Sequence, residues 1–195
     1  MNEAVKSFFS NMLAVILGIV ITFTVQGMID RAGDRREVRK ALELVRTELV
    51  SNREDIRDLR EYLAQERVSA QYLEDHAEYL EKLERMDSAT VDSVTFHQSF
   101  VYADVSVALP HDALELLKMS SLFQKIGDNA LSMKIIRAYD CCQLLVDNMN
   151  RYISKRDAQP AEETARWILE HETSQYTDAT DIDKAVTAIN KFLRQ

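Results

Sequence analysis

The N-terminal part of the chain contains a long run of uncharged, mostly apolar residues. No charged residue lies between Lys6 and Asp30, and a helix of this length at ~1.5 Å per residue can cross a ~30 Å hydrocarbon core. The pattern predicts a short tail at residues 1–7 and a transmembrane helix at 8–29. The alternative is a signal peptide cleaved near Gly27, but the length of the run favours a retained anchor.

Behind this run, apolar residues recur at steps of three and four, which is the spacing of one helix face. The stripe predicts one long helix over residues 30–86. Eleven of its thirteen positions from Val38 to Leu80 are apolar, and the exceptions are Asn52 and Glu66. A coiled-coil seam in this stripe would consist of Leu42, Val45, Leu49, Asn52, Ile56, Leu59 and Leu63.

Two packings would bury this stripe. A second copy of the chain could pair with it, and Asn52 would then fix the register of the dimer. Alternatively, later helices of the same chain could cover it. Apolar residues such as Tyr62 and Tyr72 broaden the stripe in its distal half. We therefore expect the distal half to enter a bundle and the proximal half to form a stalk.

Residues 87–195 carry further amphipathic patterns and predict a helical bundle that packs on the distal part of the long helix. Pro110 suits the first turn of a helix, and Gly127 suits its end. Asp128 is placed to cap a long helix that ends before Pro160.

Two further segments complete the expected all-α fold. Thr180 with Asp183 resembles a capping pair for a final helix. Apolar residues alternate from Val101 to Leu109, as they do in a strand. A helical face also fits this segment, and a lone strand would have no partner in the chain. We therefore predict a helix here as well.

The composition agrees with long helices. The chain of 195 residues contains only four Gly and two Pro, which are the residues that turns require. The two cysteines, Cys141 and Cys142, are neighbours and provide no disulfide framework.

The charges are unevenly distributed. A basic collar directly follows the apolar run and consists of Arg31, Arg35, Arg36, Arg39 and Lys40. Only Lys6 precedes the run, so the positive-inside rule places the body in the cytoplasm, below a bacterial inner membrane. The collar also suits anionic lipids. Residues 47–195 carry 17 basic against 27 acidic side chains, which argues against nucleic-acid binding.

The predicted span has one face of small or polar residues at every fourth position: Ser10, Ala14, Gly18, Thr22 and Gln26. Such a face lets two helices approach closely and form hydrogen bonds across the contact. We therefore expect transmembrane self-association and a homo-oligomer.

A resemblance supports this organisation. The residues that carry it are Gly18, Ile19, Ile21, Thr22, Ala113, Leu116, Lys118, Ser120, Ser121, Ile126, Leu131, Ile135 and Tyr139. With the order of elements, they resemble a group of uncharacterised single-pass membrane-anchored helical proteins common in Bacteroidetes. The resemblance implies an anchored helical protein without catalytic residues. The N-terminal tails of that group are often more basic than Met1–Lys6, and such a tail would hold the body outside, so both orientations stay open.

Motifs for catalysis, cofactors and metals are not found in the sequence. The four glycines are too scattered for a phosphate-binding loop. The four histidines lack the spacing of helix-borne zinc or di-iron ligands. We therefore expect no catalytic, cofactor-binding or metal-binding residues and no enzymatic activity.

Two functions fit these features. The first is a membrane-anchored scaffold or adaptor that self-associates and engages a protein partner. The alternative is a sensory or regulatory subunit whose bundle binds a small ligand and signals through a partner.

Overall fold

The computed structural model describes residues 3–77, 87–171, 173 and 178–194, with side chains from residue 33 onward. Every helix or strand in these residues is an α-helix, which confirms the predicted all-α fold over this part of the chain. The helices are α1 (Glu3–Asp75), α3 (Ser88–Val101), α4 (Asp112–Met119), α5 (Leu122–Lys125), α6 (Asn129–Asp157), α7 (Ala161–Glu170) and α8 (Thr180–Leu193).

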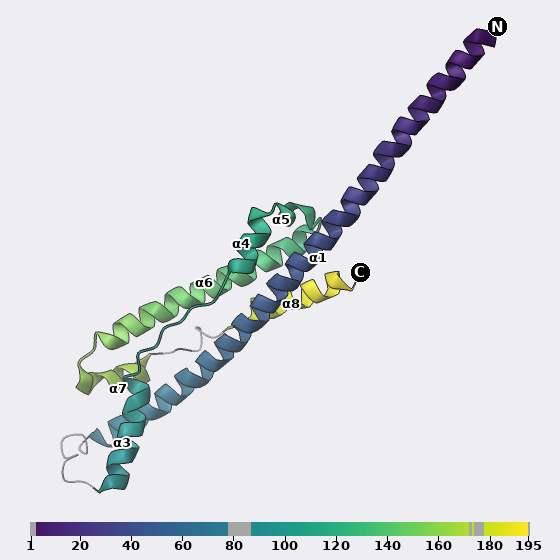
Figure 1. Ribbon diagram of the computed structural model, residues 1–195. Helices are drawn as coiled ribbons and strands as arrows, with labels where there is room; N and C mark the ends of the chain where they lie inside the picture. Colours follow the sequence, from purple (N-terminus) through teal and green to yellow (C-terminus); the bar gives the residue numbers. More distant parts are fainter. Residues whose placement is uncertain (1–2, 78–86, 172, 174–177, 195) are drawn as a thin grey trace.

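Helix α1 is continuous and forms the axis of the molecule (Figure 1). Its N-terminal part extends away from the other helices, and the body is wrapped around the rest. Of the residues 30–86 predicted as one helix, 30–75 belong to α1, and 78–86 lie outside the described residues. The predicted span at 8–29 is part of α1, but its side chains are outside those described. Where side chains are described, no helix is both long and apolar enough to cross a membrane.

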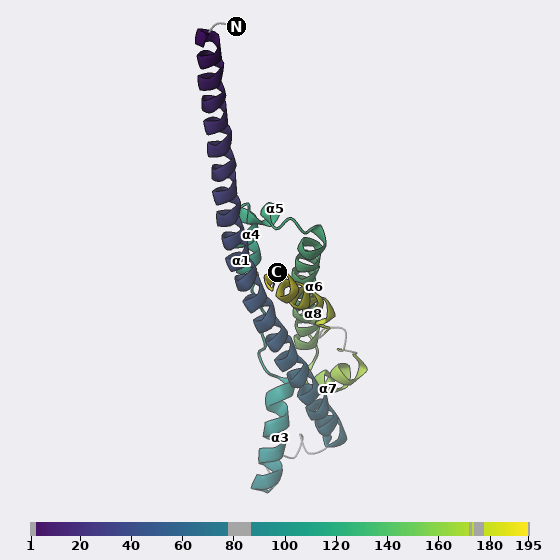
Figure 2. The same ribbon diagram turned by 90° about the vertical axis from the view of Figure 1, so that its right-hand side faces the viewer.

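Helix α6 lies beside α1 and runs in the same direction (Figures 1 and 2). Tyr139 of α6 bonds to Glu48 of α1, and Arg156 bonds to Glu66, at sequence separations of 91 and 90. The nearly constant separation means that the two helices keep one register over most of their shared length. Helix α8 runs the opposite way along both.

The body covers α1 from Val38 onward rather than only its distal part. The main core contains α1 residues from Val38 to Leu63 together with residues of α4, α6 and α8. A smaller core at the far end joins α1 to α3 and α7. The prediction of a proximal stalk is therefore wrong for residues 38–49, because α4, α6 and α8 reach back along the helix and bury its apolar face.

The predicted helix at 101–109 is also wrong, because residues 103–110 form an extended, non-helical segment between α3 and α4 (Figure 1). Side chains from the neighbouring helices donate hydrogen bonds to two backbone carbonyls of this segment. Arg156 donates to the carbonyl of Ala103 at 2.7 Å, and Asn52 donates to the carbonyl of Pro110 at 2.9 Å. The alternation seen in the sequence reflects an extended chain that lies on a helical surface without a partner strand.

The helix caps follow the predictions in part. The Asp128 side chain accepts a hydrogen bond from the backbone N–H of Leu131 at 2.9 Å and caps α6 as predicted. The predicted pairing of Thr180 with Asp183 is wrong, because Asp178 instead accepts hydrogen bonds from the backbone and hydroxyl of Thr180.

Candidate functional site

The predicted coiled-coil seam forms the face of α1 that the chain's own helices bury. Its residues are at most 9% exposed. They are Leu42, Val45, Leu49, Asn52, Ile56, Leu59 and Leu63. Of the two packings that the sequence left open, the structure therefore adopts the one within a single chain.

Asn52 occupies a fully buried position on this face and ties α1 to the extended segment. Its amide nitrogen donates to the carbonyl of Pro110 and lies 3.7 Å from the sulfur of Cys142. Its amide oxygen has no hydrogen-bond partner among the described residues. The polar side chain expected to set a register between two copies thus sets the position of a loop in one chain.

A second buried polar layer lies around Glu66, further along α1. Arg156 of α6 donates to one carboxylate oxygen of Glu66 at 2.7 Å, and Tyr152 donates to the other at 2.8 Å. The Glu66 and Arg156 side chains are 1% and 2% exposed. Arg156 also bonds to Asp157 at 2.9 Å and to the carbonyl of Ala103. One guanidinium therefore joins α1, α6 and the extended segment.

The electrostatics of this layer follow from its burial. Burial raises the pKa of the Glu66 carboxyl, although the hydrogen bonds from Arg156 and Tyr152 oppose that shift. Burial and the adjacent Glu66 also raise the pKa of Tyr152. A carboxylate and a guanidinium in contact can serve in catalysis, but these are closed off from solvent and bonded to each other. The arrangement acts as a structural clamp.

Glu48 makes a third polar contact nearer the N-terminal end of the body. Its two carboxylate oxygens accept the backbone N–H of Ala113, at 3.2 and 3.0 Å, at the start of α4. The helix has no side-chain cap of its own at His111. Tyr139 donates to the same carboxylate at 2.5 Å. Glu48 therefore supplies from α1 the anionic cap that α4 lacks, which complements its dipole.

Two histidines stack on one aromatic ring at the far end of the body. The Tyr72 ring lies between the rings of His76 and His97, at centroid distances of 4.3 and 4.0 Å. Burial, and then the neighbouring His76, lower the pKa of His97. Within the described residues, no group of three or more His, Cys, Asp or Glu side chains is arranged to hold a metal ion. The stacked rings therefore serve to pack α3 against α1.

The neighbouring cysteines are both free thiols. Burial raises the pKa of Cys142 to about 11 and raises that of the half-buried Cys141 as well. Both remain protonated near neutral pH, and a protonated thiol is a poor nucleophile and metal ligand.

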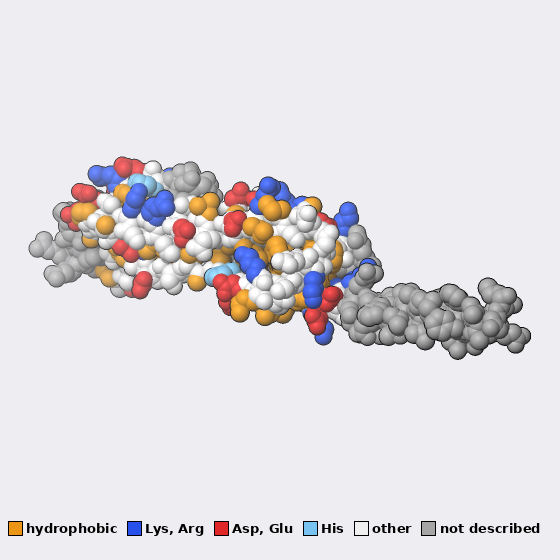
Figure 3. Space-filling model, turned by 90° about the horizontal axis from the view of Figure 1, so that it is seen from above, with side chains coloured by type: hydrophobic (Ala, Val, Ile, Leu, Met, Phe, Trp, Pro, Cys, Tyr) orange, Lys and Arg blue, Asp and Glu red, His pale blue; other side chains and the backbone are white. Residues whose placement is uncertain are grey.

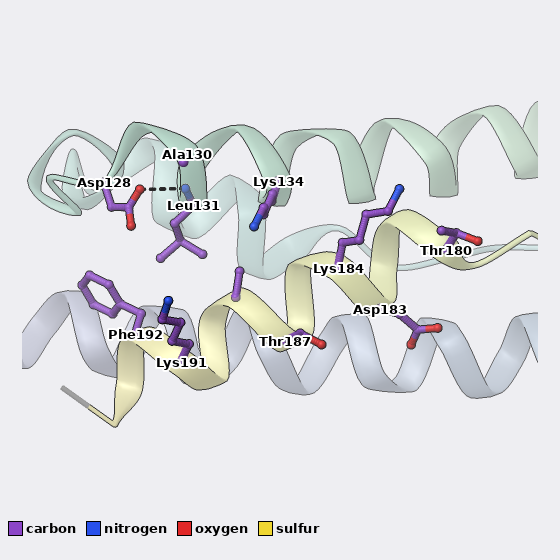
Figure 4. A pocket seen from close by; sticks show the side chains of 11 residues that line it. Asp128, Ala130, Leu131, Lys134, Thr180, Asp183, Lys184, Thr187, Lys191 and Phe192 are labelled. Carbon is purple, nitrogen blue, oxygen red and sulfur yellow. Dashed lines mark hydrogen bonds between the residues drawn. The ribbon is translucent and has the colours of Figure 1, made fainter.

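An open groove of about 680 Å³ lies between the start of α6 and the length of α8 (Figure 4). Lys134, Lys184 and Lys191 line it together with the carboxylates of Asp128 and Asp183. Phe192 lies near Leu131 at one end. Lys184 bonds to Asp181 at 2.7 Å. The sequence did not indicate this groove, because its walls come from helices that are about fifty residues apart in the chain.

The basic collar lies where α1 enters the body. Arg35, Arg36, Arg39 and Lys40 are exposed on α1, and Arg39 donates to the carbonyl of Leu193 at the end of α8. The side chain of Arg31 lies outside the described residues, as do those of the small-residue face: Ser10, Ala14, Gly18, Thr22 and Gln26. Lys and Arg side chains are visible at this end of the body in Figure 3.

Comparisons of the chain with protein-family models, with curated proteins and with solved structures find no match.

Proposed function

We propose that this protein is a membrane-anchored helical scaffold that self-associates and engages a protein partner without catalysis. The observation that carries the proposal is the continuity of α1, which runs from Glu3 to Asp75 with its later half inside the core of the body. A body built on the same helix as its anchor has a fixed position relative to that anchor. A flexible linker would not provide such a platform.

The anchor itself rests on the sequence. Residues 8–29 form the single span of a bacterial inner membrane, and the collar places the body on the cytoplasmic side. Recovery of the full chain in the membrane fraction after a carbonate wash supports this. Release by washing, as a chain trimmed near Gly27, would contradict it.

The role as a scaffold is supported by the way that the body uses its polar residues. Glu48, Asn52 and Glu66 all bond within the chain and hold helices and loops together. The apolar stripe of α1 is already covered. Self-association then depends on the small-residue face of the span, and partner binding depends on the outer surface of the body.

Gly18→Leu is expected to weaken self-association, because the larger side chain separates two helices that meet at this face. Chemical crosslinking of the full chain in native membranes should show the dimer band reduced by roughly tenfold, the effect of ~1.4 kcal/mol. Val20→Leu is the matched control, since residues two apart point about 200° apart around a helix. Equal crosslinking of both variants and the wild type would rule out this face as the contact.

A second candidate function is a sensory subunit that binds a small anion, and the lysine-lined groove between α6 and α8 is the observation that favours it. Inorganic phosphate should then raise the thermal midpoint of the detergent-solubilised full chain. The increase should be lost in the double variant Lys134→Gln with Lys191→Gln. An unchanged midpoint in the wild type leaves the scaffold as the better proposal.

A further inference from the structure

The end of the body nearest the anchor is built from three segments that are far apart in sequence. These are residues 33–40 of α1, residues 118–128 at the end of α4 and around α5, and residues 191–194 at the end of α8. Two contacts bring them together. Lys125 Nζ lies 2.7 Å from Asp34 Oδ1, and Arg39 bonds to the carbonyl of Leu193. We refer to these three segments as the proximal face.

The charge of the proximal face is opposite to that of the whole chain. Its segments carry eight Lys or Arg side chains against three Asp or Glu, whereas the full chain carries 24 against 32. Half of the basic side chains come from the collar of α1. The others are Lys118, Lys125, Lys191 and Arg194. Folding therefore brings cations from the middle and from the end of the chain to the collar and roughly doubles the number of basic side chains there.

The geometry of α1 fixes how close this face lies to a bilayer. Asp34 is five residues beyond Ile29, which corresponds to ~8 Å along the helix. The headgroup layer on each side of the hydrocarbon core is ~5–8 Å thick. Lys125, paired with Asp34, therefore lies at the outer edge of the headgroups. Arg194 follows Leu193, whose carbonyl bonds to Arg39. It therefore lies within about one Debye length of the outer edge of the headgroups.

The corner between α4 and α5 adds an apolar group to this face. Met119 is 84% exposed, the largest value among the described large apolar side chains. Ser121, two residues later, has a left-handed backbone with φ 59° and separates α4 from α5. Exposed apolar side chains beside basic ones are typical of surfaces that lie on a membrane.

We propose that the proximal face lies against anionic lipid headgroups of the bilayer that holds the span, and so keeps the body upright on the membrane. The proposal rests on the proposed anchor. It adds that the cations of α4, α5 and α8, which lie more than seventy residues from the collar in sequence, attract the lipid headgroups together with it. Charge complementarity selects acidic phospholipids over neutral ones.

The test uses the full chain in lipid nanodiscs of phosphatidylcholine, with and without phosphatidylglycerol. A short pulse of lysine acetylation, read by mass spectrometry, measures the accessibility of Lys118 and Lys125. We expect both to react about fivefold more slowly in the anionic discs and to regain their reactivity in high salt. Lys155, exposed at the opposite end of α6, is the internal control and should react equally in all discs.

A charge-reversal variant supplies a second readout. Lys118→Glu with Arg194→Glu should abolish the lipid dependence at Lys125, whereas Arg151→Glu with Lys155→Glu, at the far end of α6, should leave it intact. If Lys118 and Lys125 each react at the same rate in both kinds of disc, the proposal is overturned, while the proposed anchor is not contradicted. Protection that is the same in neutral discs and insensitive to salt would also overturn it. A chain that fails to enter the discs would contradict the anchor instead.

Discussion

Replacing Arg156 with alanine is expected to lower the free energy of unfolding by about 3–5 kcal/mol, because the carboxylate of Glu66 would remain buried without its charge partner. The carbonyl of Ala103 would lose its donor as well. In a chain of this size the thermal midpoint should fall by roughly 10 °C. Circular dichroism of the detergent-solubilised full chain provides the measurement.

Two variants separate loss of this clamp from loss of charge alone. Arg151→Ala removes an exposed arginine from the same helix and should change the stability by less than about 0.5 kcal/mol. Replacing both Glu66 and Arg156 with leucine removes both buried charges and should recover most of the loss. If Arg156→Ala unfolds like the wild type, then Glu66 does not depend on Arg156 for its charge partner. That result would contradict the assignment of this pair as a structural clamp.

Leu49→Ala is expected to cost about 2–5 kcal/mol, because Leu49 is fully buried and its truncation leaves a cavity in the main core. Leu44→Ala is the matched control, since Leu44 is 51% exposed on the same helix. Its effect should stay within about 0.5 kcal/mol. Thermal unfolding of the two variants in the same detergent gives the comparison.

The concentration dependence of the Leu49→Ala effect distinguishes the two ways of burying the stripe. If helices of the same chain cover Leu49, the loss in stability is the same at every protein concentration. If a second copy covered it, the loss in stability would depend on protein concentration even in a Gly18→Leu background, in which the span contact is weakened. A concentration-dependent loss would therefore contradict the packing described here.

The sequence predicted the helices of this protein better than their partners. The stripe from Val38 to Leu73 could be assigned because a fixed spacing requires one buried face. Nothing in the spacing states whether that face meets a second copy or the same chain. The predicted stalk was wrong for this reason. A correct prediction would have required knowing that α6 and α8 extend back to the level of Val38.

The polar layers were only partly predictable. Asn52 and Glu66 stood out as interruptions of an apolar stripe, which is a usable signal for a buried polar group. Their partners, Pro110 and Arg156, lie 58 and 90 residues away, and no local pattern connects them. Arg156 in particular resembles an ordinary basic residue at a helix end. The extended segment was missed because those distant side chains hydrogen-bond to its carbonyls.

The unbroken helix that joins the N-terminal segment to the body has a geometric consequence. Each residue of a helix turns the chain by about 100° and advances it by ~1.5 Å. The direction in which the body faces around the N-terminal segment is therefore set by the number of residues between them. Inserting one residue near Gly33 would turn every surface of the body by more than a quarter of a circle. Inserting seven residues would nearly restore the original orientation of the body and would move it ~10 Å further along the helix axis.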